Sequence, residues 1–309
     1  MHLAVIIPTW QRLVKLKACL ESLENQTTLP DLVLITVRNE DLDTLAFLKP
    51  WSALTPLKTQ LVLLDKPGVI YAENQAIGLV KSIPEISIVT FMDDDAIAFP
   101  DWIQKIKNFF QHNAQAAAIG GPDIIKSEPW TYHDCSVETV GKLTAYGKVI
   151  GNHHHKSQGL RQVNALKGVN MSVRKNFLQE IDGKLQGENP AKGNGVFWEL
   201  DVCLKIQQAQ GTIFFDPNLL ITHDSDHRHF IANSVISSTS HNLAYVLMKN
   251  LSPLKRSIFL IYAFFIGNAH IKGILKTLVE IVKTKSLRPI AEFRYSMEGF
   301  RDGILTWLR

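Results

Sequence analysis

The chain has 309 residues, 46% of them apolar and 20% charged, a composition that excludes a disordered protein and indicates a large globular core. The formal net charge of +4 is too small and too dispersed to indicate a nucleic-acid-binding protein. The three cysteines have no metal-type spacing, and their odd number argues against a disulfide framework. The sequence starts without a basic leader or a cleavage site, so we expect a cytoplasmic protein.

Apolar runs alternate with helical patterns along the first hundred residues. The patterns predict strands at 3–7, 32–37, 61–64 and 88–92, helices at 13–23 and 69–82, and a short amphipathic segment that ends at Leu48. Alternation at this spacing favours right-handed crossovers and a parallel sheet. Because ligands of such sheets bind beyond the carboxyl ends of the strands, we expect the loops after these four strands to share one edge.

The fourth predicted strand ends in three consecutive carboxylates, Asp93, Asp94 and Asp95. Adjacent like charges repel one another, and a divalent cation with oxygen ligands relieves that repulsion. The alternative is a solvated acidic turn or a helix cap ahead of Trp102. The chain has neither of the common glycine-rich phosphate loops after a strand, so a metal ion on the aspartates is the expected means of holding a diphosphate.

Nine short motifs occur in the order and at the spacing of one enzyme family. They are residues 5–12, 19–23, 26–27, 68–74, 91–95, 168–174, 182–183, 198–201 and 217–223. Together they resemble the family 2 glycosyltransferases over about the first two thirds of the chain. The resemblance implies an α/β protein with the GT-A nucleotide-binding fold, a central mostly parallel sheet flanked by helices. We expect a GT-A domain at 1–229, with a nucleotide-sugar-binding half at 1–125 and an acceptor-binding half at 126–229, and a C-terminal helical segment at 230–309.

The resemblance also implies a donor site for a nucleotide-diphosphate sugar, with a UDP-sugar favoured. The donor-binding residues carried over from the family motifs are Pro8, Thr9, Arg12, Arg38, Asn39, Gly68, Asn74, Asp93 and Asp94. Asp95 is the implied ligand of a divalent cation, Mn²⁺ or Mg²⁺, and Asp94 could substitute because a triplet leaves the register open. The chain departs from the family where Arg38 and Asn39 replace an aspartate, and where Glu73 replaces an arginine.

Two further carboxylates, Glu199 and Asp201, stand just ahead of a predicted helix. In inverting members of the family, a carboxylate at the position of Glu199 takes the proton from the acceptor hydroxyl. Its apolar neighbours would desolvate Glu199 and make it a better base. The alternative is an acidic residue that only stabilises the helix start. We expect Asp201 to orient its neighbours or cap the helix, on an acceptor side that includes Asn170 and Trp198.

Histidines raise the question of metal binding at two places. His223 ends an apolar run, and we expect it to complete the metal site, with a hydrogen-bonded structural histidine as the alternative. The polar residues that follow are expected to form a lid; they are Asp224, Asp226, His227 and His229. Residues 153–155, three consecutive histidines, are expected in a solvated acceptor-side loop. Among the aromatic residues, Trp102 is expected in the core, and Trp130 and Tyr132 are candidates for stacking on a sugar.

The C-terminal segment differs from the rest of the chain. Residues 257–266 are apolar but too few to cross a bilayer, which takes about twenty residues. Beyond them a helical apolar stripe, from Ile271 to Val282, has lysines off the stripe. This pattern fits a hairpin packed on the main domain or a segment in the interface of an anionic membrane. We favour the membrane, which also explains a mean hydropathy of +0.02, and expect a peripheral protein at the cytoplasmic face.

The resemblance, taken with these patterns, implies a metal-dependent inverting glycosyltransferase. It would move a sugar from a nucleotide-diphosphate donor to a hydroxyl of a lipid-linked or polysaccharide glycan. Two other interpretations stay open. One is a nucleotidyltransferase that makes the activated sugar, although residues 8–12 lack the expected glycine- and arginine-rich loop. The other is a catalytically silent, membrane-associated scaffold on the same fold.

Overall fold

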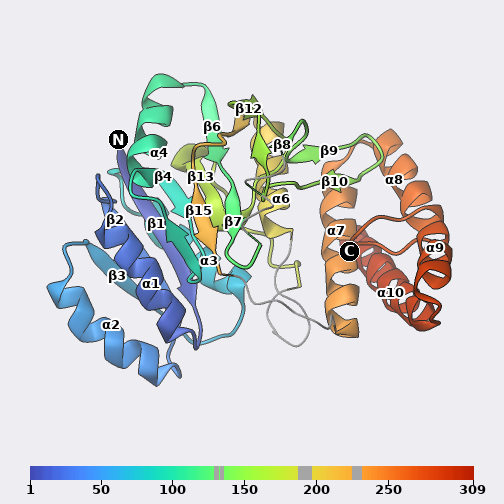
Figure 1. The fold of residues 1–309 in the computed structure, drawn as a ribbon, viewed down its shortest axis with the longest axis horizontal. Coiled ribbons are helices and arrows are strands. Elements are labelled where there is room, and N and C mark those ends of the chain that lie inside the picture. Colours follow the sequence, from blue (N-terminus) through green and yellow to red (C-terminus); the bar gives the residue numbers. More distant parts are fainter. Residues whose placement is uncertain (129–131, 133–135, 187–196, 225–231) are drawn as a thin grey trace.

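The computed structural model describes residues 1–128, 132, 136–186, 197–224 and 232–309, and its centre is an eight-stranded sheet (Figure 1). The strand order is β12-β14-β6-β13-β4-β1-β2-β3. The strands are β1 (His2–Thr9), β2 (Leu32–Arg38), β3 (Thr59–Leu64), β4 (Ile86–Phe91), β6 (Ala116–Gly120), β12 (Arg161–Gln162), β13 (Met171–Arg174) and β14 (Thr212–Phe215). Strands β3, β2, β1 and β4 are parallel, and so are β6 and β14, whereas β13 runs antiparallel to β4 and β6. The predicted, mostly parallel sheet is confirmed.

The predicted N-terminal strands are all present, and β1 is longer than expected. Pro8 and Thr9, which follow the predicted strand at 3–7 and were expected in the loop after it, continue β1 opposite Thr36 and Val37. Proline is tolerated there because the pairing of β1 with β4 ends at Ile6, so its missing N–H lies beyond that ladder.

Helices cover both faces of the sheet. Those of the nucleotide-binding half are α1 (Leu13–Glu24), α2 (Leu42–Leu54), α3 (Val69–Lys81) and α4 (Trp102–His112), and α6 (Trp198–Gln208) follows in the acceptor half. Leu3, Val5 and Ile7 of β1 pack in one core with α1, α2 and α4, while Ala4 and Ile6 pack in a second core with α3 and α6. Burial on both faces explains why the strand has an unbroken apolar sequence.

A second, three-stranded sheet positions the acidic triplet. Its order is β5-β15-β7, with β5 (Ala96–Ala98), β15 (Ile221–His223) and β7 (Asp123–Ile125). His223 pairs with Ala96, and Ile221 pairs with Asp123 on the other side. The backbone N–H of Asp224 also donates to the carbonyl of Asp95 at 2.9 Å. Segments that are far apart in the sequence therefore meet at the end of β4.

The acceptor half contains four more short strands. Strands β9 (Lys142–Leu143) and β10 (Val149–Ile150) form one two-stranded sheet, and β8 (Ser136–Val137) and β11 (Lys156–Ser157) form another.

The C-terminal segment is helical, as predicted. It contains α7 (Asn233–Asn250), α8 (Pro253–Phe265), α9 (Ile274–Thr284) and α10 (Arg288–Leu308). Helices α7 and α10 approach closely where α10 has Gly299 and Gly303. A Cβ at either position would overlap a carbonyl of α7, so glycine permits the close approach. Buried side chains of α7 share a core with α3 and α6, while α8 and α9 lie farthest from the sheet (Figure 1). Within the described parts of the chain, no helix is both long and apolar enough to cross a membrane. The predicted boundary at residues 229 and 230 lies outside the described residues.

Candidate active site

The side chains of the three aspartates after β4 point in two different directions. Asp94 faces the first strand and helix: Oγ1 of Thr9 donates to its Oδ2 at 2.8 Å, and Nη1 of Arg12 donates to its Oδ1 at 3.2 Å. Burial raises the pKa of Asp94 to about 6, in spite of these two donors. Asp94 is therefore held by the residues that follow the apolar part of β1, at the same edge of the sheet.

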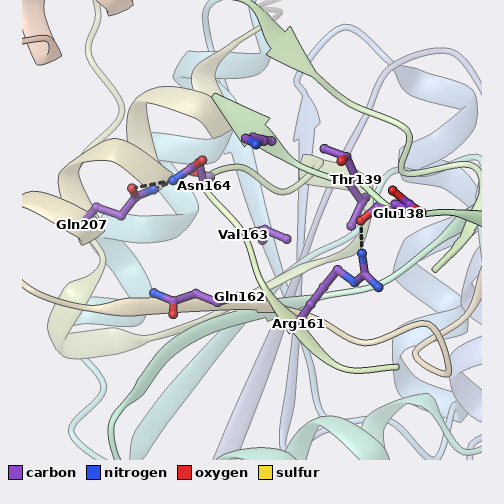
Figure 2. A pocket seen from close by; sticks show the side chains of 9 residues that line it. Glu138, Thr139, Arg161, Gln162, Val163, Asn164 and Gln207 are labelled. Atoms are coloured by element: carbon purple, nitrogen blue, oxygen red, sulfur yellow. Dashed lines mark hydrogen bonds between the residues drawn. The ribbon is translucent and has the colours of Figure 1, made fainter. Parts of the chain in front are cut away.

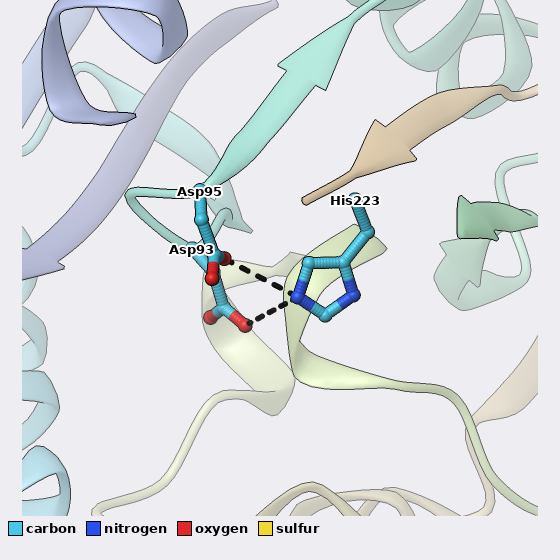
Figure 3. Close-up of side chains that lie close together, drawn as sticks. All are labelled: Asp93, Asp95 and His223. Carbon is cyan, nitrogen blue, oxygen red and sulfur yellow. Dashed lines mark ion pairs between the residues drawn. The ribbon is translucent and has the colours of Figure 1, made fainter. Parts of the chain in front are cut away.

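Asp93 and Asp95 face His223 instead, as Figure 3 shows. Nε2 of His223 lies 3.2 Å from Oδ1 of Asp95 and 3.9 Å from Oδ2 of Asp93. One possible ligand atom from each of the three side chains lies within 4.8 Å of the others. The carboxylates on either side of Asp94 thus form the cluster with the imidazole.

The chemistry of this cluster fits a divalent cation. Two carboxylates and an imidazole offer the oxygen and nitrogen donors that Mn²⁺ accepts. Within the described residues, Oδ1 of Asp95 is buried and, apart from the ion pair with His223, has no hydrogen-bond partner. A bound cation would satisfy this buried oxygen.

The imidazole is cationic when no metal ion is bound. Burial by itself would lower the pKa of His223, but the neighbouring carboxylates of Asp123 and Asp95 outweigh burial and raise the pKa to about 9. Burial would likewise raise the pKa of Asp95, but His223 and Arg12 bring it below its usual value. The proton on His223 thus holds the two carboxylates together, and metal binding would displace it.

Basic side chains border the acidic cluster. Nη1 of Arg12 lies 2.9 Å from Oδ2 of Asp95, and Nζ of Lys15 lies 4.0 Å from the same oxygen. Nζ of Lys15 also donates to the carbonyl of Asp224 at 2.7 Å. A ligand that combines a cation with phosphate groups would find carboxylates for the cation and basic side chains for the phosphates here.

Behind His223 lies a buried network that no sequence motif indicated. Nδ1 of His223 is 3.3 Å from Oδ2 of Asp123, whose side chain is 0% exposed. Nζ of Lys167 donates to the same oxygen at 2.5 Å, and Nδ1 of His154 is 3.2 Å from Oδ1. Burial would raise the pKa of Asp123, but Lys167 and the two imidazoles hold it well below its usual value. The ionised Asp123 fixes the ring of His223 so that Nε2 faces Asp95.

The expectation of a solvated loop for the three consecutive histidines is wrong for His153. This side chain is 5% exposed, and its Nε2 lies 3.0 Å from the carbonyl of Ala165. Burial lowers the pKa of His153 to about 4. Consecutive side chains point in different directions, so one histidine enters the core while His154 faces Asp123.

The aromatic predictions had different outcomes. Trp102 is a core residue, as expected, and is 0% exposed. Tyr132 is buried and donates its hydroxyl to the carbonyl of Pro217 at 3.2 Å, so the expectation that its ring stacks on a sugar is wrong. Trp130 and the lid residues Asp226, His227 and His229 lie outside the described residues.

Glu199 stands in the first turn of α6 rather than ahead of the helix. The helix begins after Phe197, whose backbone is left-handed with φ of 76°. Burial raises the pKa of Glu199 to about 7; backbone N–H groups and Lys167 favour the ionised form, and the charge of Asp93 opposes it. A carboxyl group that titrates near neutral pH suits proton transfer at that pH.

The predicted acceptor-side residues contact mainly other buried or partly buried groups of the protein itself. Asn170 accepts a hydrogen bond from Nε1 of Trp102 at 3.0 Å and donates to two backbone carbonyls. Trp198 packs against Phe91 with a ring separation of 5.1 Å. Asp201 accepts a hydrogen bond from Nδ2 of Asn250 at 3.0 Å, and this bond links α6 to α7. Whether these residues also contact an acceptor stays a prediction.

Four more of the predicted donor-side residues lie on or next to β2 and α3. The guanidinium of Arg38, at the end of β2, lies 4.4 Å from the ring centroid of Trp10, and the exposed Asn39 follows it. Gly68 precedes α3 with φ of 119°, a conformation that favours glycine. Asn74 on α3 makes two hydrogen bonds of 2.8 Å with the backbone of Ile181.

Glu73 stands where the chain departs from the family pattern, and it is buried. Its side chain is 1% exposed, and among the described residues its Oε2 has no hydrogen-bond partner. Burial, together with the charge of Asp93, raises its pKa well above the usual value. Burial therefore favours the uncharged form of Glu73, and a carboxyl group cannot supply the positive charge of the family's arginine.

A separate hollow of about 470 Å³ lies in the acceptor half (Figure 2). Its lining is mostly polar and consists of Glu138, Thr139, Val140, Lys142, Arg161, Gln162, Val163, Asn164 and Gln207. Much of that polar surface is already paired: Asn164 donates to Gln207 at 3.2 Å, and Arg161 donates to the carbonyl of Glu138. None of the predicted site residues lines it.

Two solved structures with a similar fold are glycosyltransferases. One is the mannosyltransferase PcManGT of Pyrobaculum calidifontis, in complex with GDP-Man and Mn²⁺, with a TM-score of 0.57, 13% identity, and coverage of 99% of this chain and 87% of that one. Another is TarS of S. aureus in complex with UDP-GlcNAc, with a TM-score of 0.55, 14% identity, and coverage of 98% and 92%. The fold is thus the predicted GT-A fold of nucleotide-sugar-dependent glycosyltransferases.

The sequence matches define the family. The model of glycosyl transferase family 2 matches residues 4–180, so the chain belongs to this family and is a glycosyltransferase. A curated relative, the glucosyl-dolichyl phosphate glucuronosyltransferase of Haloferax volcanii, is 24% identical over 145 residues. That match spans 44% of this chain and 42% of the relative. Family membership favours a transferase over the nucleotidyltransferase and the silent scaffold.

Proposed function

We propose that this protein is a metal-dependent inverting glycosyltransferase that acts on a hydroxyl of a glycan or lipid-linked acceptor. The observation that carries the proposal is the contrast between two acidic centres. Asp95 is kept ionised beside His223, which suits a metal ligand, whereas burial raises the pKa of Glu199 to about 7, which suits a base. Carboxyl groups in such different environments can take different roles in one reaction.

The donor is proposed to bind along the strand ends, between the acidic cluster and the basic side chains of Arg12 and Lys15. Asp93, Asp95 and His223 would hold Mn²⁺ or Mg²⁺. A bound cation would offset the negative charge of a diphosphate. A UDP-sugar remains the favoured donor on the family resemblance.

The transfer step uses Glu199 as the base. Its carboxylate accepts the proton of the acceptor hydroxyl while that oxygen forms a bond to the anomeric carbon of the donor sugar. The bond from this carbon to the diphosphate oxygen breaks, and the electron pair leaves with the diphosphate. Because the nucleophile and the leaving group lie in line, the anomeric configuration inverts.

The acceptor is proposed to be lipid-linked, at the cytoplasmic face of a membrane. The name of the Haloferax relative includes a dolichyl phosphate carrying a sugar, which is a lipid-linked molecule. The C-terminal helices, proposed as a peripheral membrane segment, would bring the transferase to such an acceptor.

Donor hydrolysis tests this proposal without knowledge of the acceptor, because water can replace the acceptor hydroxyl. Release of nucleoside diphosphate from a panel of UDP- and GDP-sugars is measured with and without Mn²⁺. We expect Glu199→Gln to lower turnover with little change in nucleotide binding, whereas Asp95→Ala weakens nucleotide binding and removes its dependence on Mn²⁺. Unchanged activity in both variants overturns the proposal.

A further inference from the structure

Most of the exposed large apolar side chains in the described residues lie in the C-terminal helices. On α8, Leu254, Ile258, Ile261 and Phe265 are between 39% and 73% exposed. Their spacing of four, three and four residues places them on one face of the helix. Phe259 lies on the opposite face and is 0% exposed, so α8 packs by one side and presents an apolar stripe on the other.

Helix α9 repeats this arrangement. Leu275, Leu278, Val279 and Val282 are between 43% and 77% exposed, at helical spacing, while Thr277 is turned inward and 7% exposed. The two helices are neighbours, since the N–H of Lys276 donates to the carbonyl of Ile266 at 3.2 Å. In Figure 1 both lie on the side of the C-terminal helices away from the central sheet.

The charge of this helical hairpin is strongly asymmetric. Residues 253–287 contain six lysines and arginines and a single acidic residue, Glu280. Glu280 is already paired with Nζ of Lys272 at 2.8 Å. Lys283 and Lys285 are exposed at the end of α9. Helix α10, in contrast, carries three arginines and three acidic residues, so the positive charge is specific to the two helices with apolar stripes.

An aromatic pair joins the acceptor half to the same hairpin. Tyr146, in the turn between β9 and β10, lies 4.6 Å from Tyr262 of α8 between ring centroids, and it is 38% exposed. Tyrosine is enriched where a protein meets the interface of a bilayer. The turn of the acceptor half thus lies beside the apolar stripe of α8.

We propose that the α8–α9 hairpin docks on the surface of a bilayer that contains anionic lipid. The apolar stripes enter the boundary between headgroups and acyl chains, and Lys283 and Lys285 contact lipid phosphates. A second copy of the chain fits this face less well, because pairing two such surfaces would bring like charges together. The inference rests on the proposed function in one respect, since docking places the acceptor half next to lipid-linked substrates.

Vesicle co-sedimentation with the full chain tests the docking surface. The vesicles are phosphatidylcholine alone or phosphatidylcholine mixed with phosphatidylglycerol. We expect binding to the mixed vesicles, weakened by salt, and lost in Leu278→Glu and Val282→Glu. Leu54→Glu on α2 is the matched control, because Leu54 is also apolar and 85% exposed, and it should bind like wild type. Lys283→Gln combined with Lys285→Gln should weaken binding roughly 25-fold, at about fivefold per lysine.

The possible outcomes distinguish a lipid bilayer from a second copy of the chain as the partner of the α8–α9 hairpin. Equal binding by Leu278→Glu and Leu54→Glu, with circular dichroism showing that both are folded, overturns the proposal. So does a lipid-independent dimer that Leu278→Glu dissociates, because the face would then be an interface between copies. Donor hydrolysis without vesicles should be the same in Leu278→Glu and wild type. If no variant hydrolyses a nucleotide sugar while vesicle binding follows the expected pattern, the proposed function fails and the docking surface stands.

Discussion

Replacing Glu199 with glutamine should change how the stability of the protein depends on pH. Burial raises the pKa of this carboxyl from 4.5 to about 7. Below pH 4.5 the group is protonated in both the folded and the unfolded chain, and it contributes nothing to the pH dependence. As the pH rises towards 7, the unfolded chain ionises first, and the native state loses stability relative to it.

The size of the effect follows from the shift in pKa. Each unit corresponds to about 1.4 kcal/mol, so the full shift of about 2.5 units would cost about 3 kcal/mol above pH 7. Glu199 is only half-buried in terms of accessible surface, so solvent screening reduces this to about 2 kcal/mol between pH 5 and pH 8. Glutamine does not titrate. We therefore expect Glu199→Gln to gain about 2 kcal/mol over wild type between these pH values.

Urea unfolding of the metal-free protein, followed by tryptophan fluorescence at pH 5, 6, 7 and 8, measures this difference. Glu21→Gln on α1, where the carboxyl is exposed, is the control and should follow the wild type at every pH. In donor hydrolysis, turnover by the wild type should rise with pH and level off above about 7. If Glu199→Gln and wild type show parallel pH dependence of stability, Glu199 is not desolvated, and the physical basis for its role as a base is removed.

Three further substitutions test the site from other directions. Asp123→Asn should weaken Mn²⁺ binding by roughly 10- to 100-fold, because Asp123 fixes the ring of His223. Calorimetry without nucleotide measures the affinity for Mn²⁺, and an unchanged affinity would contradict this role of Asp123. Gly168→Ala should destabilise the fold by about 1–3 kcal/mol in urea unfolding, since a Cβ there would overlap the ring of Trp198. Asn170→Ala should cost about 2–4 kcal/mol of unfolding free energy, because a buried indole donor and two carbonyls lose their partner. A stable Asn170→Ala with weaker acceptor binding would instead support the predicted acceptor-side role.

The large elements could be predicted from the sequence because their signals are long. Strand β4 is an unbroken apolar run since both of its faces are covered, and the triplet after it had to emerge at the sheet edge. His223 could be placed at a strand end because an apolar run precedes it. The match of the ordered family motifs added the expectation of Glu199 as a base, which no periodicity would show.

The details of the site depend on contacts that the sequence does not reveal. Strands of three residues carry too little pattern to be recognised, yet β5, β15 and β7 decide that Asp95 rather than Asp94 faces His223. Asp123 meets His223 across 100 positions of sequence and has no motif of its own. His153 looked solvent-facing among polar neighbours, but a backbone carbonyl satisfies it inside the core.

The dependence of nucleotide binding on the metal site is measured by thermal unfolding with Mn²⁺ and a panel of nucleoside diphosphates. A ligand that binds only the native state raises the melting temperature, and the rise grows with the logarithm of the ratio of ligand concentration to dissociation constant. We expect one diphosphate and Mn²⁺ together to raise the melting temperature of the wild type more than the sum of their separate effects. Asp95→Ala should lose this joint effect. A panel with no shift for any diphosphate, or an equal shift in Asp95→Ala, would contradict a metal-held diphosphate at this site.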